Sequence, residues 1–224
     1  MNKTFKLKSL LLSMVVAGAA TASIAPTVAQ AEVSYNAAVS NMYLWRGQQI
    51  SAASGVVSGG ADYSHESGLY VGMWTSSEGA AESTEYDLYG GYAFKLGEVD
   101  LTVGYNAYLY PDAGGSKFGR DSGSLITEYM LSAGYGDLSA TAYINTETDD
   151  ADNYKYVSLD YAIGSFGLHA GATLADTDEN EYTDVNVSYA ATDALSFTVS
   201  KAQGDGIADV NEKPMIQVTY SFPL

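Results

Sequence analysis

The side chains with chemical potential in this chain are mostly carboxylates. Asp and Glu number 27 against 10 Lys and Arg, the formal net charge is −17 at pH 7, and there are two histidines and no cysteine. Within segments that alternate between apolar and polar residues, eight charged or titratable residues share the polar face. They are Arg46, Glu85, Asp87, Asp100, Glu128, Asp160, His169 and Asp184. If this face lines a passage, an excess of carboxylates favours cations and disfavours anions.

His169 is the strongest catalytic candidate, because a hydrolase places a histidine beside a nucleophile and an orienting group. The sequence has no G-x-S-x-G nucleophile motif, and Ser, Asn and Asp occupy many other polar-face positions. We therefore expect His169 to be a hydrogen-bonded interior residue and predict that the protein is not an enzyme. His65 lies in the short segment "SHESG" and is expected to pack in a turn.

The acidic segment "DTDENEYTD" has some features of a calcium loop. Oxygens at a suitable spacing are offered by Asp176, Asp178 and Asn180. An EF-hand would, however, need Gly in place of Glu181 and Glu in place of Val187. We predict no metal site and no cofactor. Weak binding of solvated divalent ions stays open, and the default interpretation is a charged, soluble rim.

The elements that must position these residues are β-strands, because segment after segment alternates with period two. In "GEVDLTVGYNAYLY", for example, Val99 and Leu101 alternate with Asp100 and Thr102, and the terminal segment 213–224 alternates in the same way. About twelve such segments follow one another. Short connections are expected at 64–68, 95–98, 135–137, 163–165 and 191–194, and longer polar ones at 46–54, 76–83, 111–123, 146–153, 175–181 and 202–214. Strict alternation of short and long connections predicts an antiparallel meander with two different rims.

Alternation alone does not say which face of the strands is inside. A soluble sandwich would bury the apolar face, whereas a transmembrane barrel turns it towards lipid and tolerates a polar interior. The polar face is rich in Gly, Ser, Thr, Asn and Asp, and strands of about ten residues suit a tilted membrane crossing. The 19 tyrosines gather near strand ends, as in interfacial aromatic girdles. These features predict an all-β fold, a transmembrane antiparallel barrel of about twelve strands over residues 32–224.

Arg46 is expected to end the first strand of this barrel. Tyr43 and Trp45 continue the lipid-facing alternation of that strand, and a long loop starts after them. At the extracellular rim, Arg46 would pair with interior acids or help define the constriction. The alternative is that interior carboxylates pair with Arg46 or bond tyrosine hydroxyls and plug a narrow barrel.

The N-terminus has the pattern of a secretory signal peptide. Lys3, Lys6 and Lys8 precede a diluted apolar run, and "AQA" ends at Ala31. Cleavage before Glu32 would remove three lysines and no acid, which makes the mature chain more acidic still. No later apolar stretch reaches about 18 residues, so no transmembrane helix is predicted. So acidic a chain is also not expected to bind nucleic acid.

Several phrases carry a family resemblance. They are "VSNMYLWRG" at 39–47, "GGADYSHESGLYVGMW" at 59–74, "EYDLYGGYAF" at 85–94 and "YNAYLYP" at 105–111. In order and spacing they resemble the TorF family of porin-like proteins, also called Gcw_chp. The likeness is strong over residues 33–111 and softer after that. It implies an outer-membrane barrel in a Gram-negative bacterium and a pore, and it identifies no solute.

Three functions follow as hypotheses. The first is a porin-like channel for passive diffusion of small polar solutes, with cations or zwitterions preferred. The second is a non-conducting structural or interaction barrel with acidic extracellular loops, and the third is a hydrolase, for which His169→Ala is the test. Expected partners are outer-membrane lipid, lipopolysaccharide, and the barrel assembly machinery, which would recognise the C-terminal strand. The sequence leaves the oligomeric state open.

Overall fold

The computed structural model describes residues 31–52, 54–77, 84–110, 124–146, 154–175 and 180–224. Residues 1–30 of the predicted signal peptide lie outside this range, as do Asp176 and Asp178 of the acidic segment. Among the described residues, no helix is long and apolar enough to cross a membrane.

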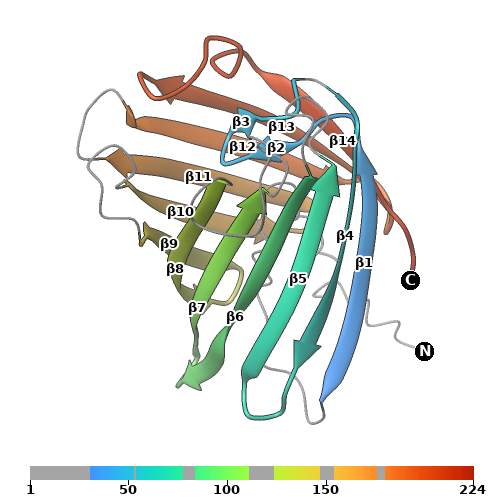
Figure 1. Cartoon of the computed structure of the whole chain (residues 1–224), viewed down its shortest axis with the longest axis vertical. Coiled ribbons are helices and arrows are strands. Elements are labelled where there is room, and N and C mark those ends of the chain that lie inside the picture. The colour runs from blue at the N-terminus through green and yellow to red at the C-terminus, as the bar shows by residue number, and fades with distance from the viewer. Residues whose placement is uncertain (1–30, 53, 78–83, 111–123, 147–153, 176–179) are drawn as a thin grey trace.

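Twelve strands form a closed antiparallel barrel in which each strand pairs with its neighbours along the chain (Figure 1). They are β1 (Glu32–Ser40), β4 (Val56–Ser64), β5 (Leu69–Ser77), β6 (Thr84–Leu96), β7 (Val99–Tyr110), β8 (Ser124–Tyr135), β9 (Leu138–Asn145), β10 (Tyr154–Ile163), β11 (Phe166–Ala175), β12 (Tyr182–Ala190), β13 (Leu195–Gly204) and β14 (Met215–Ser221). The prediction of a meander barrel of about twelve strands is confirmed.

The apolar face of the strands points outwards. On β8, Tyr129 and Leu131 are 57% and 48% exposed, whereas Glu128 and Met130 between them are 0% and 5% exposed. A water-soluble sandwich would show the opposite pattern, because burial of apolar surface is what drives it to fold. An apolar exterior around a polar interior is the arrangement of a transmembrane barrel.

The two rims of the barrel differ as the sequence predicted. β4–β5, β6–β7, β8–β9, β10–β11 and β12–β13 are joined by short turns, and we call this end the short-turn rim. Gly97, Gly136 and Gly164 each adopt positive φ in two-residue turns, which is the geometry that a tight hairpin requires. The opposite end, where the longer connections lie, is the long-loop rim.

The C-terminal strand closes the barrel against the first strand. The β1–β14 ladder covers Ala38–Ser40 and Thr219–Ser221. The side chain of Asn41 extends it, because its Nδ2 donates to the Ile216 carbonyl (3.1 Å) and its Oδ1 accepts from the Val218 amide (2.7 Å). The alternating C-terminus is therefore the lipid-facing and lumen-facing pattern of the closing strand.

One expectation about the first strand is wrong. Tyr43 and Trp45 do not continue its lipid-facing stripe, because β1 ends at Ser40 and the chain then turns into the lumen. There it forms the small hairpin β2 (Leu44–Trp45) and β3 (Gln48–Gln49), which Figure 1 shows among the barrel strands. Tyr43 is only 2% exposed. We call residues 41–52 the inner hairpin.

Candidate functional site

The inner hairpin turns on two residues with left-handed backbone. Trp45 pairs with Gln48, and between them Arg46 and Gly47 have φ of 47° and 77°. Positive φ at both central residues is the signature of a two-residue turn that matches the twist of its strands. At a residue other than glycine this conformation costs about 1 kcal/mol, so the side-chain contacts of Arg46 must offset it.

Arg46 forms a buried ion pair with Glu128. Its Nη1 and Nη2 donate to the two carboxylate oxygens at 2.8 and 2.7 Å, and the two side chains are 3% and 0% exposed. The hydroxyls of Tyr108 (3.0 Å) and Tyr154 (2.8 Å) also donate to Glu128. Burial alone lowers the pKa of Arg46, but the charge and hydrogen bonds of Glu128, together with Tyr108 and Tyr154, outweigh it, and the net pKa lies above its ordinary value. The guanidinium therefore stays charged inside the barrel.

Aromatic rings surround the same guanidinium. Its Cζ lies 4.4 Å from the ring centroid of Trp45, 4.5 Å from that of Tyr143 and 4.6 Å from that of Tyr156, with Tyr154 at 5.9 Å. All four are within the distance at which a cation is attracted to an aromatic face. We call Glu128 and these rings the Arg46 pocket.

Tyr43 connects the base of the inner hairpin to β5 and β6 of the wall. Its hydroxyl donates to Glu85 Oε1 (2.9 Å), while Tyr110 donates to Glu85 Oε2 (2.9 Å). Its ring packs against Trp74, with centroids 5.7 Å apart. Burial raises the pKa of Tyr43, and the carboxylates of Glu85 and Asp87 raise it further, so the phenol keeps the proton that it donates.

The rest of the inner hairpin reaches the remaining side of the lumen. Gly47 lies against β12 and β13, since a Cβ there would be 2.3 Å from the Cβ of Asp184. The Gln49 amide donates to Asn211 Oδ1 (3.0 Å), and Gln217 Nε2 on β14 donates to the Met42 carbonyl (3.0 Å). The inner hairpin thus contacts strands on opposite sides of the barrel and crosses the lumen.

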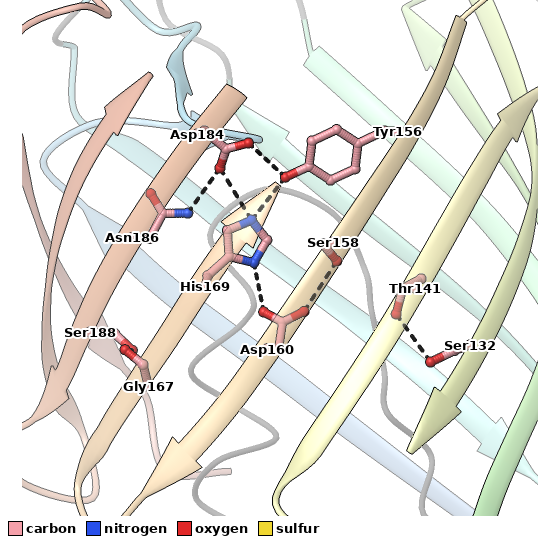
Figure 2. Close-up of polar contacts among 10 residues, drawn as sticks. All are labelled: Ser132, Thr141, Tyr156, Ser158, Asp160, Gly167, His169, Asp184, Asn186 and Ser188. Atoms are coloured by element: carbon pink, nitrogen blue, oxygen red, sulfur yellow. Dashed lines mark hydrogen bonds and ion pairs between the residues drawn. The ribbon is translucent and has the colours of Figure 1, made fainter. Parts of the chain in front are cut away.

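His169 lies in the half of β11 nearer the short-turn rim, which we call below the inner hairpin. Figure 2 shows its ring between Asp160 and Asp184. Its Nδ1 is 2.6 Å from Asp160 Oδ1, and its Nε2 is 2.8 Å from the Tyr156 hydroxyl and 3.2 Å from Asp184 Oδ1. The Tyr156 hydroxyl also donates to Asp184 Oδ2 (2.9 Å). Because Tyr156 also forms part of the Arg46 pocket, the two clusters share a side chain.

Small polar residues line the wall around and below His169. Figure 2 shows Ser132 beside Thr141 (3.1 Å) and Ser158 beside Asp160 (3.2 Å). The exposure of the inner face increases in this direction: on β8, Glu128 and Met130 are buried, and Ser132 is half-buried. The lumen is therefore packed at the level of the inner hairpin and more accessible near the short-turn rim.

The structure divides the eight predicted residues into three groups. Buried at the level of the inner hairpin are Arg46, Glu85, Asp87, Glu128 and Asp184. Half-buried below it are Asp160 and His169. Asp100 lies near the short-turn rim in an exposed ion pair with Lys95. Arg46 does not end a wall strand as expected but lies at the tip of the inner hairpin.

Sequence reasoning missed the interior tyrosines and Asp62. Tyr108 and Tyr156 face inwards beside the carboxylates, and Tyr89 bonds Asp62 across two strands. Their place in the strand alternation was the available signal, since Tyr108 has the same parity as Asp100. The girdle interpretation of the tyrosines is thus only partly right, because Tyr89, Tyr108 and Tyr156 are buried inside.

Among the described residues, the geometry around His169 lacks a serine or threonine nucleophile. Both ring nitrogens contact carboxylate or phenol oxygens, and in the described part of the chain no serine or threonine hydroxyl bonds to them. His65 Nδ1 is 2.9 Å from Ser67 Oγ, but this contact lies within an exposed turn. No group of three or more His, Asp or Glu side chains in the described ranges is arranged to hold a metal ion.

One family model and several solved structures match this chain. The family is described as "Bacterial protein of unknown function (Gcw_chp)" and matches residues 25–219, but the name TorF is not part of that description. None of the curated proteins matches. The KdgM porin has a TM-score of 0.51 at 11% identity, over 86% of this chain and 99% of that one.

Two further barrels are more distant. Outer membrane phospholipase A from Escherichia coli has a TM-score of 0.45 at 12% identity, covering 84% of this chain and 90% of that one. Pseudomonas aeruginosa OccK9 has a TM-score of 0.43 at 16% identity, covering 76% and 55%. At these identities the likeness concerns the fold, and KdgM alone of the three exceeds a TM-score of 0.5.

Proposed function

The chain belongs to the bacterial Gcw_chp family, and we propose that it is an outer-membrane channel for passive diffusion of small polar solutes. Cations and zwitterions are preferred over anions. The observation that carries the proposal is the charge of the interior: Glu85, Asp87, Glu128 and Asp184 are all buried there with Arg46 as the facing arginine. Interior carboxylates favour cations through their local potential.

The location proposed is the outer membrane of a Gram-negative bacterium. An apolar exterior on a closed sheet suits lipid, because closure leaves few unpaired backbone groups. The fold likeness to the KdgM porin supports this location. Export by the signal peptide, contact with lipopolysaccharide and recognition of β14 by the assembly machinery belong to the same proposal.

The lumen as described represents a closed conformation of this channel. The half near the short-turn rim offers half-buried Ser, Thr and Asp side chains that suit a hydrated path. The half near the long-loop rim is crossed by the inner hairpin, which is fixed by Arg46 and Tyr43. Conduction therefore requires the inner hairpin to shift, and loosening it should increase conductance.

Planar-bilayer recording of the purified protein tests the proposal. We expect discrete conductance steps, a reversal potential in a KCl gradient that indicates cation preference, and larger or more frequent openings in Arg46→Ala. Lys95→Ala is the matched control, because it removes a cation from an exposed pair at the rim. Silence in both the wild type and Arg46→Ala, or a preference for anions, would contradict the proposal.

A second candidate is a non-conducting structural barrel. It is favoured by the same buried ion pair, since a lumen filled by Arg46, Glu128 and Tyr43 resembles a protein core more than a passage. In that case the recordings stay silent even when the inner hairpin is loosened, and deletion of the acidic loops alters envelope integrity or partner binding.

A further inference from the structure

We propose that the Arg46 pocket is a binding site for solutes that carry a guanidinium or primary ammonium group, and that Arg46 occupies it in their place. This inference rests on the proposed channel, because it names the class of solute that the channel admits when the inner hairpin shifts. In this proposal, Arg46 on the inner hairpin competes with the solute for the pocket. Its test measures binding and does not depend on conductance.

The pocket belongs mainly to the barrel wall. Glu128 comes from β8, Tyr143 from β9, and Tyr154 and Tyr156 from β10, so these groups remain in place when the inner hairpin withdraws. They provide aromatic faces around a carboxylate. An aromatic cage with a carboxylate is a recurrent way to bind alkylammonium and guanidinium ions.

The buried negative charge of Glu128 requires a cation in the Arg46 pocket. Glu128 is completely buried and receives hydrogen bonds from Arg46, Tyr108 and Tyr154. Removing one partner of a buried ion pair leaves an uncompensated charge, which is strongly unfavourable. A solute cation that takes the place of Arg46 relieves this penalty, whereas a neutral solute or an anion does not.

The shape of the contact favours guanidinium over ammonium. Arg46 uses two parallel N–H donors on the two oxygens of Glu128, at 2.8 and 2.7 Å. A planar guanidinium reproduces this fork, and an ammonium group supplies a point charge without the second parallel bond. We therefore expect guanidinium compounds to bind more tightly than amines of the same size.

The inner hairpin is attached in a way that permits exchange. Its ladder consists of the pairs Leu44–Gln49 and Trp45–Gln48, and it forms a separate sheet from the barrel. Withdrawal of β2 and β3 therefore breaks no ladder between the twelve wall strands. Arg46 also adopts a left-handed backbone, so release of the turn relieves local strain.

Trp45 supplies the measurement. The chain has two tryptophans, and Trp45 lies 4.4 Å from the guanidinium of Arg46. In a Trp74→Phe background its fluorescence reports occupation of the pocket. Folded protein in detergent is titrated with Nα-acetyl-L-argininamide, whose guanidinium is its sole charge, and with Nα-acetyl-L-citrullinamide as the uncharged isostere at the same ionic strength.

We expect a saturable change with Nα-acetyl-L-argininamide and none with Nα-acetyl-L-citrullinamide. Glu128→Gln should weaken binding by about tenfold or more, and Arg46→Ala should strengthen it by about tenfold because the competitor is absent. If Arg46→Ala does not fold alone, Nα-acetyl-L-argininamide in the refolding buffer should restore folding and Nα-acetyl-L-citrullinamide should not. Binding confined to Arg46→Ala still supports the site.

Absence of saturable binding in both the wild type and Arg46→Ala would overturn the inference, as would equal responses to the two amides. The outcome is separable from that of the proposed function. Binding in detergent together with silent bilayer recordings would keep the site and contradict the channel. Cation-selective conductance without Nα-acetyl-L-argininamide binding would keep the channel and contradict the site.

Discussion

Carboxylates in the two halves of the lumen differ in burial and in bonding partners. At the level of the inner hairpin, Glu128 is fully buried, paired with Arg46 and bonded by tyrosines. Nearer the short-turn rim, Asp160 contacts Ser158 and His169 and keeps 27% of its side chain exposed. The first half has the character of a folded core, and the second that of a hydrated wall.

The difference shows that interior polarity does not by itself make an open pore. A buried carboxylate without a partner is very unfavourable. At the level of the inner hairpin, Glu128 is therefore paired with an arginine and bonded by tyrosines of the same chain. Asp160 is partly solvated, and its partners are a histidine and a serine instead of a buried arginine and phenols. Closure at one level and access at the other are therefore consequences of the same lumen charge.

The largest expected effect concerns the buried and exposed ion pairs. Arg46→Met should destabilise the folded barrel by about 3–5 kcal/mol, because Glu128 is left charged and buried. Lys95→Met removes a cation from the exposed Lys95–Asp100 pair and should cost about 0–1 kcal/mol. Urea titration of folding in detergent, followed by tryptophan fluorescence, measures both. Similar losses in the free energy of unfolding for the two variants would contradict a core-like lumen at the level of the inner hairpin.

A smaller effect separates backbone strain from crowding at the inner hairpin. Gly47→Ala and Gly136→Ala both place a side chain at positive φ, which costs about 1 kcal/mol each. A Cβ at Gly47 also meets Asp184 at 2.3 Å, whereas Gly136 has nothing within 4 Å. Gly47→Ala should therefore cost about 1–3 kcal/mol more in the same unfolding experiment. Equal losses would mean that the inner hairpin is not pressed against the wall.

The smallest effect concerns selectivity. Asp160→Asn removes a half-exposed interior charge, so the reversal potential in a KCl gradient should shift towards zero. Asp100→Asn should shift it less, because Asp100 lies at the rim in a more exposed ion pair that solvent screens. The two reversal potentials in planar bilayers are the readout. A larger shift for Asp100→Asn would place the selective region at the rim instead of in the lumen.

Strand parity predicted much of this molecule and failed at one place. Alternation put Glu85, Glu128 and Asp184 inside because lipid and lumen impose a strict period of two on every wall strand. The same rule misassigned Tyr43, because its alternation continues past the point where β1 ends. The Arg46–Gly47 turn was the available signal for a hairpin, but nothing local in the sequence says that a hairpin folds inwards. That choice depends on Glu128, which is distant in the chain.

The central claim is that the inner hairpin closes one half of the lumen while the other half stays accessible. Because the chain has no cysteine, single substitutions report access directly. Ser200 is 1% exposed at the level of the inner hairpin, and Ser132 is half-buried below it.

The measurement is the rate at which a charged, membrane-impermeant thiol reagent modifies Ser200→Cys and Ser132→Cys in folded protein. We predict modification of Ser132→Cys about 100-fold faster than of Ser200→Cys, and a gain in the latter rate when Arg46→Ala is added. Equal rates in the two single variants would contradict the account.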